Sequence, residues 1–258
     1  MKTYVMGNWK MNLTVGDSSI YLQRLLKKIK PSRGLEIIIA PSAISLPSLS
    51  LQLERNKSKI KLAAQNFYQK DFGAYTGEIS IAQLRGVVSY ALIGHSERRF
   101  IFGETNKDIS QKVAAAIRSG ITPILCIGET ENQRNFGETI DVLRDELLGG
   151  LSEIDTEDVK KCLIAYEPVW AISTSKQARP ATPDEIAASI QLIKEQLIDI
   201  YGQETAEEIP LLYGGGVNPN NAGAYLTIPG INGVLVGESS LISDNFNEII
   251  ETAKRVRE

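Results

Sequence analysis

The sequence of 258 residues predicts an α/β protein built as a closed (β/α)8 barrel, with eight parallel strands surrounded by helices. Eight short apolar runs, bounded by glycine, proline or serine, alternate with amphipathic helical stretches, which gives eight strand-then-helix units. No linker or low-complexity segment divides these units, and about 250 residues is the usual size of such a barrel. We therefore expect one domain that spans residues 1–258.

The strand-like runs are mostly apolar on both faces, which is typical of parallel strands that are buried on both sides. They cover Thr3–Trp9, Leu35–Ala40, Lys59–Ala64, Tyr90–Gly94, Ile121–Gly128, Cys162–Glu167, Ile209–Gly215 and Ile231–Gly237. An open doubly wound sheet is the alternative, but no GxGxxG motif follows the first run, and this favours the barrel.

Helix boundaries can also be predicted between these runs. Thr105 is expected as the N-cap of a helix that stops at Gly120. A second helix is expected to begin with Thr182 as its N-cap and Pro183 at the first helical position, and to end at Gly202.

The composition excludes several classes of protein. The net charge of −3 gives no general affinity for nucleic acid or for anionic lipid, and no apolar run approaches the ~18 residues of a membrane span. Two cysteines without a CxxC pair argue against a disulfide scaffold, and a single histidine excludes a multi-histidine metal site. A cytoplasmic enzyme with no metal is the expectation, and it binds neither nucleic acid nor a membrane.

Polar residues follow several of the predicted strands. Asn8 and Lys10 come after the first run, His95 after the fourth, and Glu167 ends the sixth. In a (β/α)8 barrel the active site lies at the carboxyl ends of the strands, so we expect these four side chains to meet there.

Glycines cluster after the last two runs. The sequence YGGG occupies residues 213–216, and VGESS occupies residues 236–240. Barrels often hold a phosphate on backbone N–H groups at these two places, so a phosphate site is expected beside the four polar residues.

Seven segments resemble, in order along the chain, the signature segments of the triosephosphate isomerase family. They are GNWKMN (7–12), QNFYQKDFGAYTGE (65–78), IGHSERRFIFGE (93–104), CIGE (126–129), AYEPVWAI (165–172), LLYGG (211–215) and GVLVG (233–237). The resemblance covers the chain from end to end. It implies a barrel that acts as a homodimer or larger oligomer. It also implies interconversion of dihydroxyacetone phosphate and glyceraldehyde 3-phosphate through an enediol(ate), without a cofactor.

The resemblance also assigns roles to the polar residues. Glu167 would be the base that removes a proton beside a carbonyl, and His95 would hydrogen-bond the substrate oxygens. Lys10 would supply positive charge, and Asn8 would place it and donate a hydrogen bond. Glu97 would support the lysine. A base of this kind must be partly desolvated, and we expect the apolar surround to come from its neighbours in the sequence, Tyr166, Pro168, Val169 and Trp170.

The phosphate would be held by Ser173, Gly215, Gly216, Gly237 and Glu238, with Tyr213 in support. The family pattern implies a lid after Glu167, with a first hinge at Pro168–Trp170 and a second at Lys176–Ala178.

Four positions depart from the family pattern. Ser173 and Ser175 replace glycines, Gly216 replaces a serine whose hydroxyl latches the lid, and Glu238 replaces a second glycine. Our hypothesis is that Ser175 replaces the missing latch. We expect the Glu238 carboxylate to point away from the phosphate, because two like charges ~4 Å apart repel by ~1 kcal/mol even in water.

Three further expectations follow from the resemblance or from local pattern. The Asp71–Glu78 segment would enter a partner subunit and bring Thr76 near that subunit's Asn8 and His95. Ser96 is expected to cap a short helix, and Cys126 to be a small buried side chain.

Two other functions remain open at this point. The chain could isomerise another small phosphorylated sugar, such as a tetrulose phosphate, because the phosphate loops are altered. It could also be a catalytically silent barrel that acts as a binding protein, although the joint presence of Asn8, Lys10, His95 and Glu167 argues against this.

Overall fold

The computed structural model describes residues 2–30, 32–172 and 179–257. The expected phosphate contact of Ser173, the Ser175 latch and the Lys176–Ala178 hinge lie outside the described residues.

Eight strands within these ranges form a closed barrel in which each strand pairs with its neighbour in sequence and β8 pairs with β1. All eight pairings are parallel. The strands are β1 (Thr3–Asn8), β2 (Leu35–Ala40), β3 (Lys61–Ala64), β4 (Tyr90–Ile93), β5 (Thr122–Ile127), β6 (Leu163–Tyr166), β7 (Leu211–Tyr213) and β8 (Gly233–Val236). This confirms the predicted barrel, with every strand inside or equal to its predicted run.

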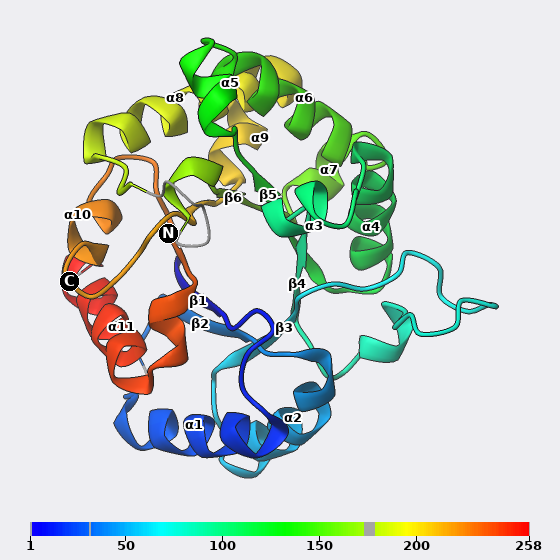
Figure 1. Ribbon diagram of the computed structural model, residues 1–258, viewed down its shortest axis with the longest axis vertical. Coiled ribbons are helices and arrows are strands. Elements are labelled where there is room, and N and C mark those ends of the chain that lie inside the picture. Colours follow the sequence, from blue (N-terminus) through cyan, green and yellow to red (C-terminus); the bar gives the residue numbers. More distant parts are fainter. Residues whose placement is uncertain (1, 31, 173–178, 258) are drawn as a thin grey trace.

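Helices surround the barrel in a ring (Figure 1). The α-helices are α1 (Val15–Lys28), α2 (Leu46–Arg55), α3 (Ser96–Phe100), α4 (Asn106–Arg118), α5 (Glu131–Asn135), α6 (Thr139–Leu151), α7 (Thr156–Val159), α8 (Pro183–Tyr201), α9 (Gln203–Glu208), α10 (Ala222–Leu226) and α11 (Ser243–Arg257). Short 3-10 turns are η1 (Ala43–Ser45), η2 (Ala82–Leu84), η3 (Val169–Ala171) and η4 (Glu238–Leu241). None of the helices in the described part of the chain is both long and apolar enough to cross a membrane.

The predicted helix boundaries at α4 and α8 are confirmed. The Thr105 and Thr182 side chains each accept a hydrogen bond from the third residue of their helix, within complete capping boxes. Gly120 and Gly202 follow the two helices with positive φ, which a residue without a Cβ adopts at low cost.

The third strand-then-helix unit differs from the prediction. Residues 65–89, between β3 and β4, contain only the 3-10 turn η2 and no α-helix. Much of this segment projects beyond the ring of helices instead (cyan in Figure 1).

Apolar side chains fill two separate layers. One set points into the barrel and includes Met6, Leu92, Cys126 and Leu235, and the other set lies between the strands and the helices. Successive strand residues alternate between these layers, so the strands are apolar throughout. The filled barrel closes its interior, and polar side chains can meet only at its ends.

Candidate active site

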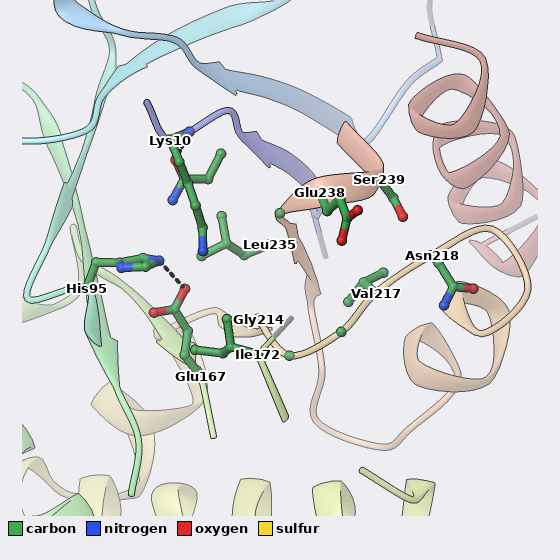
Figure 2. A pocket seen from close by; sticks show the side chains of 14 residues that line it. Lys10, His95, Glu167, Ile172, Gly214, Val217, Asn218, Leu235, Glu238 and Ser239 are labelled. Carbon is green, nitrogen blue, oxygen red and sulfur yellow. Dashed lines mark hydrogen bonds and ion pairs between the residues drawn. The ribbon is translucent and has the colours of Figure 1, made fainter. Parts of the chain in front are cut away.

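A cavity of about 140 Å³ lies at the carboxyl ends of the strands. It contains most of the predicted site residues, which come from distant parts of the chain: Asn8, Lys10, His95, Glu167, Gly215, Gly216, Gly237 and Glu238. Figure 2 shows Lys10, His95 and Glu167 pointing toward one another from three different strand ends. The structure therefore brings the four predicted polar residues together at this end of the barrel.

Glu167 follows β6 directly and its side chain is almost entirely buried, with 3% exposed. Its backbone N–H donates to the Ile127 carbonyl (2.7 Å), which extends the β5–β6 pairing by one residue. One carboxylate oxygen lies 3.6 Å from His95 Nε2, and the other is buried without a hydrogen-bond partner among the described residues. Burial raises the pKa of this carboxyl, while His95 and Lys10 act in the opposite direction. The result is a carboxylate of increased basicity with one oxygen free to accept a proton.

The apolar surround of Glu167 differs from the one expected. Tyr166 and Trp170 do not face it: they donate hydrogen bonds to the buried carboxylate of Glu129 (3.0–3.2 Å). Consecutive residues of an extended segment point to opposite sides, so Tyr166 lies outside the barrel and Glu167 inside. Ile172 and Leu235 line the cavity instead, and they come from the residues after η3 and from β8.

His95 is itself the N-cap of α3, where Ser96 was expected. Its Nδ1 accepts the backbone N–H of Glu97 (3.2 Å), so the imidazole ring takes the place of a capping hydroxyl. A nitrogen that accepts from an N–H group carries no proton, which leaves the proton on Nε2. The ring therefore presents an N–H donor to the cavity, directed toward Glu167.

Lys10 is held in a left-handed backbone conformation with φ 51. Asn8 Oδ1 accepts the Lys10 backbone N–H (3.0 Å), so in this contact the side-chain oxygen accepts rather than donates. The Lys10 ammonium donates to Glu97 Oε1 (2.6 Å). The other Glu97 carboxylate oxygen lies 3.8 Å from His95 Nδ1, so Glu97 lies against both the lysine and the histidine.

The sequence analysis missed Gln65 as a positioning residue. Its amide donates to the carbonyls of Lys10 and Ala40, both at 2.8 Å, and joins the ends of β1, β2 and β3. Gln65 is the first residue after β3, and that position was the available signal.

Glu129 is a second residue whose role was missed. It is fully buried and also pairs with Arg134 (3.1 Å), and its carbonyl accepts the Val169 N–H (3.0 Å). Arg134 and Arg179 both lie over the ring of Trp170, at 4.7 and 4.3 Å from its centroid. This network fixes the segment directly after Glu167. The final residue of the segment CIGE was its signal.

The glycine loops after β7 and β8 border the other end of the cavity. A Cβ on Gly215 would lie 2.0 Å from the Tyr213 hydroxyl, so Tyr213 packs directly against this loop, as a supporting residue would. Glu238 also lines the cavity, and its side chain lies at the same end as Val217 and Asn218 (Figure 2). That its carboxylate points away from a bound phosphate stays a prediction.

The Asp71–Glu78 segment is exposed and its Thr76 does not line this chain's own cavity. Phe72 is 84% exposed and Tyr75 is 41% exposed on the same segment. Cys126 is buried inside the barrel, as expected of a small apolar side chain.

A closed eight-stranded barrel with a desolvated carboxylate, a donating imidazole and an ammonium at its carboxyl end defines the class of α/β-barrel proteins equipped for proton transfer. Residues 3–253 match the family model described as triosephosphate isomerase. The chain belongs to the triosephosphate isomerase family.

Relatives of this chain align with it over nearly their full length. A protein of Chloroherpeton thalassium named triosephosphate isomerase is 41% identical over 98% of this chain and 99% of its own. Proteins with the same name from Dehalococcoides mccartyi and Carboxydothermus hydrogenoformans are 40% and 39% identical, over 96% and 97% of this chain and 95% and 98% of theirs.

Proposed function

We propose that this protein, acting as a single domain over residues 1–258, interconverts dihydroxyacetone phosphate and D-glyceraldehyde 3-phosphate as an aldose–ketose isomerase. The observation that carries the proposal is the convergence of Lys10, His95 and Glu167 in one cavity, within a chain that belongs to the triosephosphate isomerase family. The activity named in its relatives is the one this geometry can perform.

Glu167 is the base in this proposal. A carbon next to a carbonyl is a weak acid, so its proton is removed only by a base that is positioned and desolvated. The buried carboxylate takes the proton from one carbon and returns it to the neighbouring carbon. The hydroxyl proton moves from one substrate oxygen to the other, beside the His95 ring, and the two transfers together exchange the positions of carbonyl and hydroxyl. Its unpaired oxygen and raised pKa support this role.

His95 and Lys10 stabilise the charge that develops on the substrate oxygens. The Nε2–H group donates to the oxygen that becomes negative in the enediolate, and the ammonium lies nearby as a fixed positive charge. Both groups are held by hydrogen bonds before substrate arrives, through Glu97, Asn8 and the N-cap geometry of α3. Little reorganisation is then needed during the reaction.

The phosphate end of the substrate is assigned to backbone N–H groups of Gly215, Gly216, Gly237 and Glu238, and of Ser173 outside the described residues. The position of these loops at the ends of β7 and β8 supports the assignment, because this is where barrels commonly bind phosphate.

We also propose a homodimer in which the Asp71–Glu78 segment enters the partner and places Thr76 near its Asn8 and His95. The exposed aromatic side chains of Phe72 and Tyr75 on a projecting segment support this. Light scattering should give twice the 28.3 kDa of one chain, and a Phe72→Asp/Tyr75→Asp variant should give a monomer. A monomeric wild type contradicts the proposal.

The cytoplasmic location and the absence of a cofactor stay predictions.

A coupled assay with the two trioses tests the activity. We expect the protein to convert each of the two trioses into the other without added metal or cofactor. Weak turnover with rapid turnover of a tetrulose phosphate would point to a different sugar phosphate, and no turnover of either would leave a silent barrel.

A further inference from the structure

Glu238 gives the cavity a negative charge at the end opposite its lysine. Of the described side chains that line the cavity, Lys10 is the only cation, and Glu167 and Glu238 are carboxylic acids. The Lys10 ammonium is paired with Glu97 at 2.6 Å, so its charge is already offset before a ligand arrives. The described part of the cavity therefore carries an excess of negative charge.

Figure 2 separates the cavity into two ends. Lys10, His95 and Glu167 lie on one side, and Glu238, Val217 and Asn218 lie on the other. The second end is otherwise lined by glycine and by uncharged side chains, including Gly216, Gly237 and Ser239. An anion bound there would meet backbone N–H groups and the Glu238 carboxylate together.

We propose that Glu238 is a specificity-determining residue that selects the charge of the substrate's anionic group. Its carboxylate weakens the binding of doubly charged esters more than the binding of singly charged ones. The inference rests on the proposed function, because it takes this end of the cavity as the place where the phosphate binds.

The selection follows from the charge product. The repulsion between Glu238 and a dianion is twice that with a monoanion at the same distance. Two unit charges ~4 Å apart in water correspond to roughly a fivefold change in a binding constant. Removing the charge of Glu238 should therefore improve binding of a dianion by a factor that is about the square of the factor for a monoanion.

The same argument gives a pH dependence. A phosphate ester takes up its second proton near pH 6 and becomes singly charged below that value. In the protein as it stands, part of the affinity for a phosphate ester that is lost to repulsion at pH 7.5 should return near pH 5.5. A sulfate ester stays singly charged throughout and should not change in this way.

Isothermal titration of two glycerol esters tests the proposal directly. Glycerol 3-phosphate and glycerol 3-sulfate are titrated into the wild type and into Glu238→Gln at pH 7.5 and low salt, where exposed charges are least screened. Glu248→Gln is the matched control, because Glu248 is an exposed residue of α11 that does not line the cavity. It makes the same change in net charge elsewhere.

Glu238→Gln is expected to bind the sulfate ester up to about fivefold more tightly and the phosphate ester up to about 25-fold more tightly, the second factor being the square of the first. Glu248→Gln should leave both affinities unchanged. Added salt at 0.5 M should reduce the difference between the two esters.

Equal improvement for both esters, or no change for either, overturns the inference, since the carboxylate would then be turned away in the complex. Wild-type turnover of the trioses separates this failure from failure of the proposed function. Charge selection without turnover would support the inference and contradict the isomerase assignment, and turnover without charge selection would do the reverse.

Discussion

The two ends of the cavity are built in different ways. We propose the end with Lys10, His95 and Glu167 as the reacting end and the end with the glycine loops as the phosphate end. At the reacting end, Lys10, His95 and Glu167 are each held by hydrogen bonds or backbone pairing to neighbouring elements. At the phosphate end, glycines border the cavity, and Glu238 is exposed. The two departures from the family pattern that lie in the described residues, Gly216 and Glu238, are both at the second end.

The difference indicates which changes each end tolerates. A side chain at the reacting end must be aligned with one substrate atom, so even a small displacement reduces the rate of the chemical step. Backbone donors at the phosphate end survive a change of side chain, because every residue except proline supplies an N–H. Substitutions there should alter binding more than chemistry.

The largest effect is expected at Glu167. Glu167→Gln keeps the shape but removes the base, so kcat should fall by roughly 10²–10⁴ with little change in KM. Steady-state kinetics and a circular dichroism spectrum that matches the wild type provide the check. A rate within twofold of the wild type would remove Glu167 from the mechanism.

The second-largest loss of activity is expected at Lys10. Lys10→Met removes the fixed charge near the developing enediolate and leaves Glu97 without its partner, so kcat/KM should fall by roughly 10²–10³. Gln65→Ala, which only loosens the Lys10 backbone, should lose less, and mainly in kcat. If Gln65→Ala lowered affinity alone, the hydrogen bonds at this end would not serve the chemistry.

The pH profile sharpens the contrast between the two ends. Glu167 acts as a base only when ionised, and its pKa is raised by burial despite the opposing effects of His95 and Lys10. Activity should therefore fall as pH decreases, with a midpoint above the ordinary value of 4.5 for a glutamate.

Unphosphorylated glyceraldehyde is the substrate of choice for this measurement, since it has no phosphate that titrates near pH 6. A midpoint at or below 4.5 would mean that the carboxylate is solvated in the working enzyme. A midpoint that appears only with the phosphate ester would assign the titration to the substrate.

The smallest effects come from a matched pair of glycines. A Cβ on Gly214 would lie 2.6 Å from Glu167 Cγ, whereas a Cβ on Gly237 would meet no atom of the described residues within 4 Å. Gly214→Ala should displace the base and reduce kcat about tenfold. Gly237→Ala should raise KM only a few-fold and leave kcat unchanged. Equal effects on kcat from both substitutions would abolish the distinction between the two ends.

Much of the fold and site could be predicted from the order of elements along the chain. The apolar runs specified eight parallel strands, and polar residues at their carboxyl ends specified which side chains would meet. Thr105 and Thr182 marked two helix starts correctly, because capping is a local interaction between residues three apart.

Other features depended on contacts between segments distant in the sequence, and local pattern contains little information about them. The hydrogen bonds of Gln65 to Lys10 and Ala40 exist only after three strands are aligned. Likewise, Tyr166 and Trp170 were expected around Glu167, but strand alternation and the buried Glu129 direct them to the outer layer.

The sequence by itself determined the barrel and the strand ends at which Lys10, His95 and Glu167 meet, because these follow from periodicity and order. The roles proposed for these side chains came from the resemblance to the family. Only the tertiary structure decided how each group is presented: the His95 Nδ1 that accepts a backbone N–H, the Glu167 oxygen that is buried without a partner among the described residues, and the place of Glu238 in the lining of the cavity. Orientation and desolvation arise from packing in three dimensions, and packing is what raises the pKa of Glu167 above that of an ordinary glutamate.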